Sequence, residues 1–348
     1  MTREMVFEPH ALLGRDIIGA STRQRRRWLD HAFVYWRAHG FPYPRVAYDE
    51  MEREFGRLER IDPDTVFHKE RLGASTIGLQ LANSFHPQMW SIPAQRHARA
   101  PVDHFKDDAT LYKLLERAAR FWPNRRCWNA QCLRSVFRIY AGGRVANFRP
   151  AVARALIARY SAPGQNVLDF SAGFGGRLLG CLTLKRSYIG IDPARPQVAG
   201  LRAMLNALRQ LSESSAQIVR ACAEDFMPPL AQASVDLVFS SPPYFKVERY
   251  DRASSQSYQR YETYETWKRE FLCPIAEASY RVLRPGGHLV INVANTPRYP
   301  VARDLSAIGD ALFGQHHVLK LLMHSRPVQR SDGTQQYRWE PVLVFRKP

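Results

Sequence analysis

The second half of the chain alternates between short apolar segments and longer amphipathic ones, and this alternation limits the folds open to it. Segments of the strand type occur at residues 166–172, 188–192, 216–221, 235–240 and 288–294. Segments with helical spacing follow four of them, at residues 177–184, 195–211, 266–283 and 303–314. Strands that alternate with helices predict a parallel sheet with helices on both faces. Two further strand-like segments, "HHVLKLLMH" and "EPVLVFRK", end the chain without a helix between them, so we expect seven strands and a final hairpin with one antiparallel strand.

The first 145 residues have a different pattern. Residues 25–41 predict a helix with aromatic side chains on one side, which "FPYPRV" ends. Residues 107–122 predict a second amphipathic helix, opened by Asp107 and Asp108. We therefore expect a mainly helical region over residues 1–145 and an α/β domain over residues 146–348.

The chain is strongly basic, with 50 Lys and Arg against 32 Asp and Glu and a formal net charge of +18. A protein of this charge usually has a polyanionic partner, most simply nucleic acid, although a basic surface that only aids solubility is the alternative. Residues 1–150 and 151–348 each hold 25 Lys and Arg against 16 Asp and Glu, so both parts could face a phosphate backbone. The densest basic cluster is "RQRRRW" at residues 23–28.

Cysteine and histidine patterns argue against disulfide and metal sites. The five cysteines form no CxxC pair, and the eleven histidines form no cluster with ligand spacing. Reduced thiols favour a cytoplasmic protein. We find no signal peptide and no apolar run near the ~20 residues that a membrane helix needs, so we expect no membrane partner.

A glycine-rich loop follows the first strand of the α/β half. Gly173, Gly175 and Gly176 allow a tight turn and let a ligand approach the start of the next helix, although an ordinary strand–helix turn would look similar. Asp169 ends the strand before the loop, and Asp192 ends the following strand, where an acid can bind a ribose diol.

A further acidic pair completes the pattern. Glu224 and Asp225 follow the third strand, at the sheet edge where an adenine could lie. The loop "AGFGGR" lacks GxGxxG, and the chain contains no GxxxxGK[ST], so nicotinamide and P-loop sites are disfavoured. This order of strands, glycines and acids indicates an adenosine-containing ligand.

Residues 240–245 read "SSPPYF", directly after the core strand "VDLVF". Two prolines cannot continue a strand, and a turn that merely ends the strand is the simplest explanation. Together, however, these features resemble the class I S-adenosylmethionine-dependent methyltransferases. "SSPPYF" resembles motif IV of the DNA amino-methyltransferases, (Asp/Asn/Ser)-Pro-Pro-(Tyr/Phe/Trp). The resemblance implies a Rossmann-like seven-stranded methyltransferase sheet, preceded by a mostly helical extension, with S-adenosylmethionine as cofactor.

The motif IV resemblance implies a catalytic role for four residues, Ser241, Pro242, Pro243 and Tyr244. The reaction needs an exocyclic amine whose lone pair is delocalised into the base. The Ser241 hydroxyl and the Pro242 carbonyl can accept the two amine hydrogens, and the fixed φ of proline aims that carbonyl. Tyr244 offers a ring on which an extruded base can stack. The Pro-Cys nucleophile needed to methylate carbon 5 of cytosine is absent from this place.

"ANFRP" at residues 146–150 looks like motif X of the same family, and a connector with one buried aromatic is the alternative. The resemblance implies cofactor contacts from Phe148, Pro150, Asp169, Ser171, Ala172, Gly173, Gly175, Asp192, Glu224, Asp225 and Ser240. The arrangement is similar to methyltransferases of phages and mobile elements, which also suggests restriction–modification. Ser241 lies only 65 positions after Gly176, which leaves no room for a large recognition domain between them.

The expected function is methylation of an exocyclic base amine in DNA, in a base flipped from a duplex or presented by a single strand. Serine at the head of motif IV favours cytosine N4. Adenine N6, a base in RNA, or a nucleic-acid-binding protein with a degenerate methyltransferase fold remain the alternatives.

Target recognition is expected from the basic N-terminal region, and the oligomeric state is left open. Arg23, Arg25, Arg26 and Arg27 lie beside Trp28 and can meet phosphates or guanine edges, although they could equally form a solvated face. The polar segment 246–267 predicts a mobile loop, or simply a solvated one. The phosphate contacts expected from this segment are Arg249, Arg252 and Arg260.

Overall fold

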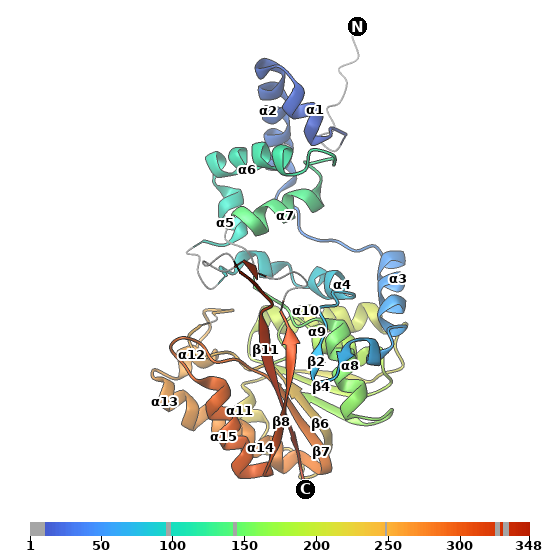
Figure 1. The fold of residues 1–348 in the computed structure, drawn as a ribbon, viewed down its shortest axis with the longest axis vertical. Helices are drawn as coiled ribbons and strands as arrows, with labels where there is room; N and C mark the ends of the chain where they lie inside the picture. Colours follow the sequence, from blue (N-terminus) through green and yellow to red (C-terminus); the bar gives the residue numbers. More distant parts are fainter. Residues whose placement is uncertain (1–10, 95–98, 142–144, 248, 324–327, 330–333) are drawn as a thin grey trace. The chain divides into compact units, whose positions relative to one another are not determined.

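The computed structural model describes residues 11–94, 99–141, 145–247, 249–323, 328–329 and 334–348 (Figure 1). The chain divides into two compact units. The first unit comprises Met1–Arg45 and Pro87–Ala146, and the second comprises Val46–His86 and Asn147–Pro348. The predicted boundary after residue 145 is therefore wrong for residues 46–86, which pack with the α/β unit.

The first unit is helical, as predicted. Its helices are α1 (Gly14–Gly19), α2 (Thr22–His39), α5 (Pro101–Lys106), α6 (Asp108–Phe121) and α7 (Ala130–Tyr140), with a short 3-10 turn at Pro87–Ser91. Asp107 caps α6 by accepting from the Thr110 N–H at 2.8 Å. Trp36 of α2 is buried and donates its indole N–H to the Trp128 carbonyl at 3.2 Å. The aromatic residues of α2 thus belong to the core of this unit.

The second unit contains a nine-stranded sheet in the order β1-β2-β8-β11-β7-β6-β3-β4-β5. Seven strands correspond to the predicted ones: β3 (Asn166–Asp169), β4 (Ser187–Asp192), β5 (Ala216–Arg220), β6 (Val235–Ser240), β7 (Leu283–Asn292), β8 (His316–Leu322) and β11 (Trp339–Arg346). β11 lies between β7 and β8 and is antiparallel to both. The predicted terminal hairpin, with one antiparallel strand, is therefore confirmed.

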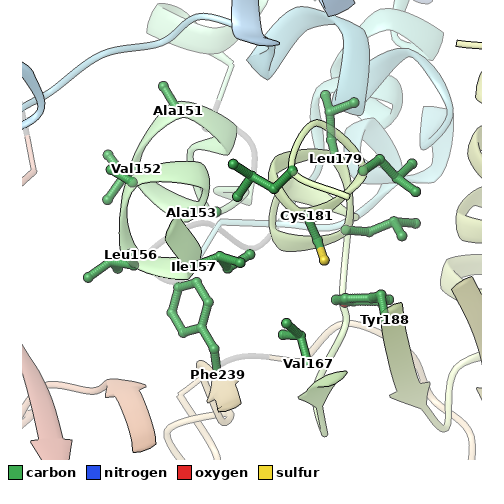
Figure 2. Packing of buried hydrophobic residues seen from close by; sticks show 14 of the residues in the cluster. Ala151, Val152, Ala153, Leu156, Ile157, Val167, Leu179, Cys181, Tyr188 and Phe239 are labelled. Atoms are coloured by element: carbon green, nitrogen blue, oxygen red, sulfur yellow. The ribbon is translucent and has the colours of Figure 1, made fainter. Parts of the chain in front are cut away.

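Successive side chains in the central strands point to opposite faces of the sheet. Val167 and Leu237 join one core cluster, whereas Leu168 and Val238 join the other. The first face is covered by α8 (Pro150–Tyr160), α9 (Gly176–Leu182) and α10 (Arg195–Leu208). The second is covered by α14 (Cys273–Val282) and α15 (Val301–Phe313). Figure 2 shows the side chains of α8 and α9 gathered over Val167, Tyr188 and Phe239 of the sheet.

Residues 46–86 complete the first face and one edge of the sheet. They form α3 (Tyr48–Glu59), a 3-10 turn (Pro63–Thr65), β1 (Phe67–His68), β2 (Arg71–Leu72) and α4 (Leu79–Ser84). Leu72 of β2 is aligned with Leu321 of β8 in a parallel pair, and Leu58, Leu72 and Leu81 are fully buried. These contacts extend the seven-stranded sheet by two short strands that the sequence pattern did not predict.

The segment that follows motif IV contains helices, whereas the sequence predicted a mobile or solvated loop. It contains α12 (Ser257–Arg260) and α13 (Tyr264–Trp267), and a π-helical turn at Lys268–Leu272 leads into α14. Trp267 is fully buried, and Tyr261 is nearly so. Tyrosine can be buried when its hydroxyl finds an acceptor, and here Tyr261 donates to Glu224 at 3.0 Å.

A two-stranded ribbon, β9 (Val328–Gln329) with β10 (Gln335–Gln336), precedes β11. Within the described parts of the chain, no helix is both long and apolar enough to cross a membrane.

Candidate active site

The residues predicted for catalysis and for cofactor binding lie at one edge of the sheet. Strands β3, β4, β5 and β6 are parallel, so their carboxyl ends lie at the same edge. Asp169 ends β3, Asp192 ends β4 and Ser240 ends β6, directly before the Pro-Pro step. The glycine loop and motif IV are thereby brought together at neighbouring strand ends.

Asp169 is fully buried at the centre of a hydrogen-bond network. Its carboxylate accepts from Arg177 Nε at 2.7 Å, the Tyr188 hydroxyl at 2.7 Å, Ser240 Oγ at 2.8 Å and the Ser171 N–H at 3.2 Å. Burial and this carboxylate raise the pKa of Tyr188 well above its usual value. These donors enclose Asp169, so its role in the structure is to fix the glycine loop to β6. Asp169 and Ser240 are both fully buried, so neither is exposed for direct contact with a cofactor. We expect them to act on the cofactor through the position of the glycine loop.

The glycine loop adopts conformations that favour glycine. Gly173 has φ +57° and Gly175 has φ +75°. A Cβ on Gly173 would meet only the Ser171 carbonyl oxygen, at 3.6 Å, so this side of the backbone is open to approach. A Cβ on Gly176 would lie 1.8 Å from the Phe148 carbonyl oxygen. The start of α9 therefore packs directly against the "ANFRP" segment.

Asn147 joins these two segments and was missed in the sequence analysis. Its side-chain oxygen accepts from the Gly176 N–H at 3.2 Å, and its amide donates to the Phe174 carbonyl at 2.8 Å and to Asn83 at 3.0 Å. Its position inside "ANFRP" was the available signal. Asn83 comes from the displaced segment 46–86, so no spacing argument could have found it.

Phe148 lies just before α8, and Pro150 is the first residue of that helix. The Phe148 ring packs edge-to-face on Phe239, with centroids 5.4 Å apart, and the Arg177 guanidinium lies 5.6 Å from its centroid. Pro150 is buried at the first turn of α8. The Phe148 carbonyl lies against Gly176 at the start of α9, and the Pro150 carbonyl lies against Gly180 within that helix. Their contact with the cofactor stays a prediction.

Asp192 lies beside the glycine loop with 8% of its surface exposed. One carboxylate oxygen accepts from the Gly173 N–H and the other from the Ala194 N–H, both at 2.9 Å. Each oxygen can accept a further hydrogen bond. Burial raises the pKa of this carboxyl to about 7. The site therefore offers an acid already aligned by two backbone amides.

Glu224 and Asp225 are held by residues from the segment after motif IV. Arg260 forms ion pairs with Glu224 at 3.0 Å and with Asp225 at 2.6 Å, and Tyr261 donates to Glu224. Burial raises the pKa of Glu224. Arg260 is thus paired with two acids of the protein itself, whereas the sequence predicted a contact with a phosphate of the nucleic acid. Its nearest anions are intramolecular.

Motif IV turns away from β6 with a strained residue. Phe245 is buried and has φ +56°, which is unusual for an aromatic residue. Its ring contacts Tyr264, Trp267 and Tyr299 at centroid distances of 5.9, 5.8 and 5.1 Å. Contacts with these three rings hold Phe245, and with it the turn after motif IV, in place. Pro242 is buried, while Ser241, Pro243 and Tyr244 are half-buried, so these three retain access to solvent.

Glu340 of β11 is a second residue missed by the sequence analysis. Burial raises the pKa of the Glu340 carboxyl, and hydrogen bonding from the side chains of Asn292 and Tyr244 opposes this shift. Asn292 ends β7, the strand between β6 and β11. Glu340 therefore connects the motif IV aromatic to the antiparallel part of the sheet. Its distance from motif IV in sequence left no local signal.

The predicted basic residues fall into two groups. Arg23, Arg26 and Arg27 are exposed, as are Arg249 and Arg252. Arg25 is half-buried, and its guanidinium donates to the carbonyls of Ile17, Ile18 and Ala20. Arg25 therefore holds the turn between α1 and α2, and this corrects its assignment as a nucleic-acid contact.

No group of metal-ligating side chains is found among the described residues. All five cysteines are free thiols. Cys222 and Cys273 are half-buried, and Cys222 donates to the Ser255 carbonyl at 3.4 Å.

Comparison with protein families identifies the C-terminal part of the chain. Residues 235–348 match the N6/N4 methyltransferase family model described as DNA methylase. The match begins with β6 and includes motif IV, β7, β8 and β11. The resemblance to the DNA amino-methyltransferases is thereby confirmed.

Solved structures of methyltransferases are also similar to this chain. A methyltransferase from Pyrococcus furiosus is 13% identical with a TM-score of 0.40, covering 62% of this chain and 93% of its own. TrmN from Thermus thermophilus is 20% identical with a TM-score of 0.37, covering 57% of this chain and 49% of its own. These scores are too low to carry an argument, so the assignment rests on the family match and the sheet order. Curated proteins gave no match.

The cofactor is S-adenosylmethionine, as the family match indicates. The residues at the sheet edge fit this molecule. Asp192 supplies acceptors suited to a ribose diol, and the backbone at Gly173 is open to approach. Glu224 lies at the start of α11 (Ala223–Phe226), after the neighbouring strand β5.

Proposed function

We propose that this protein transfers the methyl group of S-adenosylmethionine to the exocyclic amine of a base in DNA, with cytosine N4 favoured over adenine N6. The observation that carries the proposal is the position of the Ser-Pro-Pro-Tyr turn. It leaves the end of β6, next to the strand that ends at the glycine loop. The Ser240–Asp169 hydrogen bond ties the two together.

The target amine is held by the turn itself. Ser241 Oγ and the Pro242 carbonyl accept its two hydrogens, which draws the nitrogen toward tetrahedral geometry and frees its lone pair. Neither proline has an N–H that would compete for these acceptors. The Tyr244 ring stacks on the base, and Glu340 holds the tyrosine hydroxyl in place. Methylation leaves a positive charge on the nitrogen, and the methylated amine then releases one proton to water.

The cofactor is held on the other side of the same edge. When bound, S-adenosylmethionine supplies a methyl group whose bond to sulfur breaks as the bond to nitrogen forms. Asp192 accepts hydrogen bonds from the ribose, and Phe148, Ser171, Ala172 and Gly175 line the path to the methionine end. Glu224 and Asp225 border the adenine, with Arg260 as their counter-ion.

DNA is proposed as the substrate because the matched family is that of the DNA methylases and because the chain carries a net charge of +18. Exposed arginines on both units are available for phosphates: Arg23, Arg26, Arg27, Arg249 and Arg252. A base must leave its stack to reach motif IV, either by flipping or because its strand is unpaired.

Mass spectrometry of nucleosides tests the proposal. The protein is incubated with methyl-labelled S-adenosylmethionine and with duplex DNA, single-stranded DNA or RNA, and the products are digested. We expect labelled N4-methyldeoxycytidine from DNA. Labelled N6-methyldeoxyadenosine would show that the target is adenine N6 and not cytosine N4. Label in RNA alone would exclude DNA as the substrate. Absence of label together with absence of cofactor binding would indicate a degenerate fold.

A further inference from the structure

Positive charge is concentrated in the helical unit. Its two stretches, residues 1–45 and 87–146, contain 19 Lys and Arg against 8 Asp and Glu, a net charge of +11. The other unit has more than twice as many residues and a net charge of only +7. The difference in charge between the two units is not evident from the sequence. The acidic segment 46–86 lies between the two basic stretches in the sequence, but it packs with the α/β unit.

Within the helical unit, residues 117–140 carry six arginines and no acidic residue. They include the end of α6 and the whole of α7, which pack against each other (Figure 1). Two of the arginines serve the protein itself. Arg120 pairs with Glu116 at 2.8 Å, and Arg134 donates to the Pro42 carbonyl at 3.0 Å. The other four are exposed: Arg117, Arg125, Arg126 and Arg138.

Aromatic rings alternate with arginines on this surface. Arg117 lies 4.9 Å from the Tyr140 ring centroid, and Arg125 lies 4.8 Å from that of Trp122. Phe121 connects the two pairs, with its centroid 5.9 Å from Tyr140 and 4.8 Å from Trp122. Phe121 and Tyr140 are 39% and 42% exposed. We call these five residues the α6–α7 surface.

We propose that the α6–α7 surface binds unpaired nucleotides of the DNA strand. The proposal rests on the function proposed above and adds a nucleic-acid site that the sequence analysis did not assign. Rings exposed beside arginines are suited to stacking on bases while the guanidinium groups meet phosphates. The net charge of the unit complements a polyanion. Bases in a duplex are already stacked on each other, so exposed rings favour an unpaired strand.

Fluorescence anisotropy with a labelled single-stranded DNA oligonucleotide, and with the same sequence as a duplex, tests this site. Two variants are used, Arg117→Ala with Arg125→Ala, and Phe121→Ala with Tyr140→Ala. We expect each pair to weaken single-strand binding by about tenfold, because stacking contacts are worth ~1–3 kcal/mol per base. The arginine pair also lowers the log–log salt slope by about 0.7 for each lost phosphate contact.

Matched controls separate the surface from general effects. Val34→Ala removes an exposed apolar side chain from α2 of the same unit. Arg53→Ala with Arg57→Ala removes two exposed arginines of α3 that are already paired with acids. Both should leave single-strand affinity within twofold of wild type. Tyr140→Phe keeps the ring and should also bind normally.

Unchanged single-strand affinity in both test variants would overturn the proposal. Equal losses for duplex and single strand would also overturn it, because they would indicate phosphate attraction alone. Cofactor affinity, measured calorimetrically on the same variants, should stay at the wild-type value. Failure of the proposed function is recognised separately, as a wild-type protein that transfers no label to DNA whatever its affinity for the strand.

Discussion

At the scale of single residues, Asp192 gives the site a pH dependence. Burial raises its pKa to about 7, and a ribose hydroxyl donates best to the ionised carboxylate. Cofactor affinity should therefore rise as the pH increases from 6 to 8, by about tenfold, because the ionised fraction rises from roughly a tenth to nine tenths. Calorimetric titration across this range measures the effect. Asp192→Asn should bind weakly, and its affinity should not change with pH.

The same carboxyl affects stability with a definite sign. Its folded-state pKa lies above its usual value, so between about pH 4 and 7 the folded protein holds a proton that the unfolded chain releases. The contribution of Asp192 to the free energy of unfolding is therefore largest at low pH and falls as the pH rises to 7. Comparison of wild type with Asp192→Asn by urea denaturation isolates this contribution.

Ser241 is expected to act on the target amine and not on the cofactor. Ser241→Ala should lower kcat by about 10- to 100-fold, because a hydrogen bond to a group that gains charge contributes ~1.5–3 kcal/mol. Cofactor affinity should be unchanged. Single-turnover methyl transfer and calorimetry separate the two effects. Normal turnover of this variant would exclude Ser241 from the mechanism.

Glu340 is expected to position Tyr244. Glu340→Ala and Tyr244→Phe each remove one side of the same hydrogen bond, so each should raise KM for DNA by about threefold to tenfold. The double variant should be no worse than either single one, because the two residues share one interaction. Glu340→Gln retains an acceptor and should behave as wild type. Additive losses would show that the two side chains act independently.

At the scale of elements, the glycine loop packs so closely against the "ANFRP" segment that no side chain fits between them at Gly176. A Cβ on Gly176 would lie 1.8 Å from a backbone oxygen, which cannot be relieved by a side-chain rotation. Gly176→Ala should therefore lower the free energy of unfolding by about 1–3 kcal/mol and weaken cofactor binding. Gly19 has no atom within 4 Å of its would-be Cβ, so Gly19→Ala is the control and should be neutral or stabilising. Thermal unfolding and calorimetry measure both.

Local patterns predicted the central elements well. β6 was expected at residues 235–240 and lies there, because its run of apolar residues is buried on both faces. β1 and β2 could not be predicted in this way. Each of these strands has only two residues. β2 forms because Leu72 pairs with Leu321 of β8, which is remote in the sequence. Asn147 and Glu340 were missed for a similar reason, since their partners are remote in sequence.

The segment after motif IV shows the limit of composition as a guide. Its polar composition suggested a mobile or solvated loop, yet Tyr264 stacks on Tyr299 and donates to Asp304 at 2.9 Å. A tyrosine ring can pack against a core when its hydroxyl has an acceptor, and Asp304 of α15 supplies one to the half-buried Tyr264. Arg260 was misassigned for the same reason, because Glu224 and Asp225 meet it only after the chain has folded.

At the scale of the whole molecule, the excess charge predicts a salt-dependent affinity for DNA. Replacing the exposed Arg23, Arg26 and Arg27 with Ala should flatten the log–log salt slope for duplex DNA by about 0.9 for each lost phosphate contact. Cofactor affinity should not change. Arg25→Ala is expected instead to destabilise the helical unit, because Arg25 binds three backbone carbonyls. An unchanged salt slope would remove α2 from the DNA interface.

The division of the chain also sets the order in which the protein can fold during synthesis. The 41 residues from Val46 to His86 leave the ribosome before the helical unit is complete, but they belong to the other unit. Leu72 must wait for Leu321, which at 5–20 residues per second is made roughly ten to fifty seconds after His86. The helical unit ends at residue 146, so all of it is made while Leu72 still lacks its partner strand β8. A nascent chain of this protein therefore exposes a defined apolar stretch, and it is there that a chaperone would first be needed.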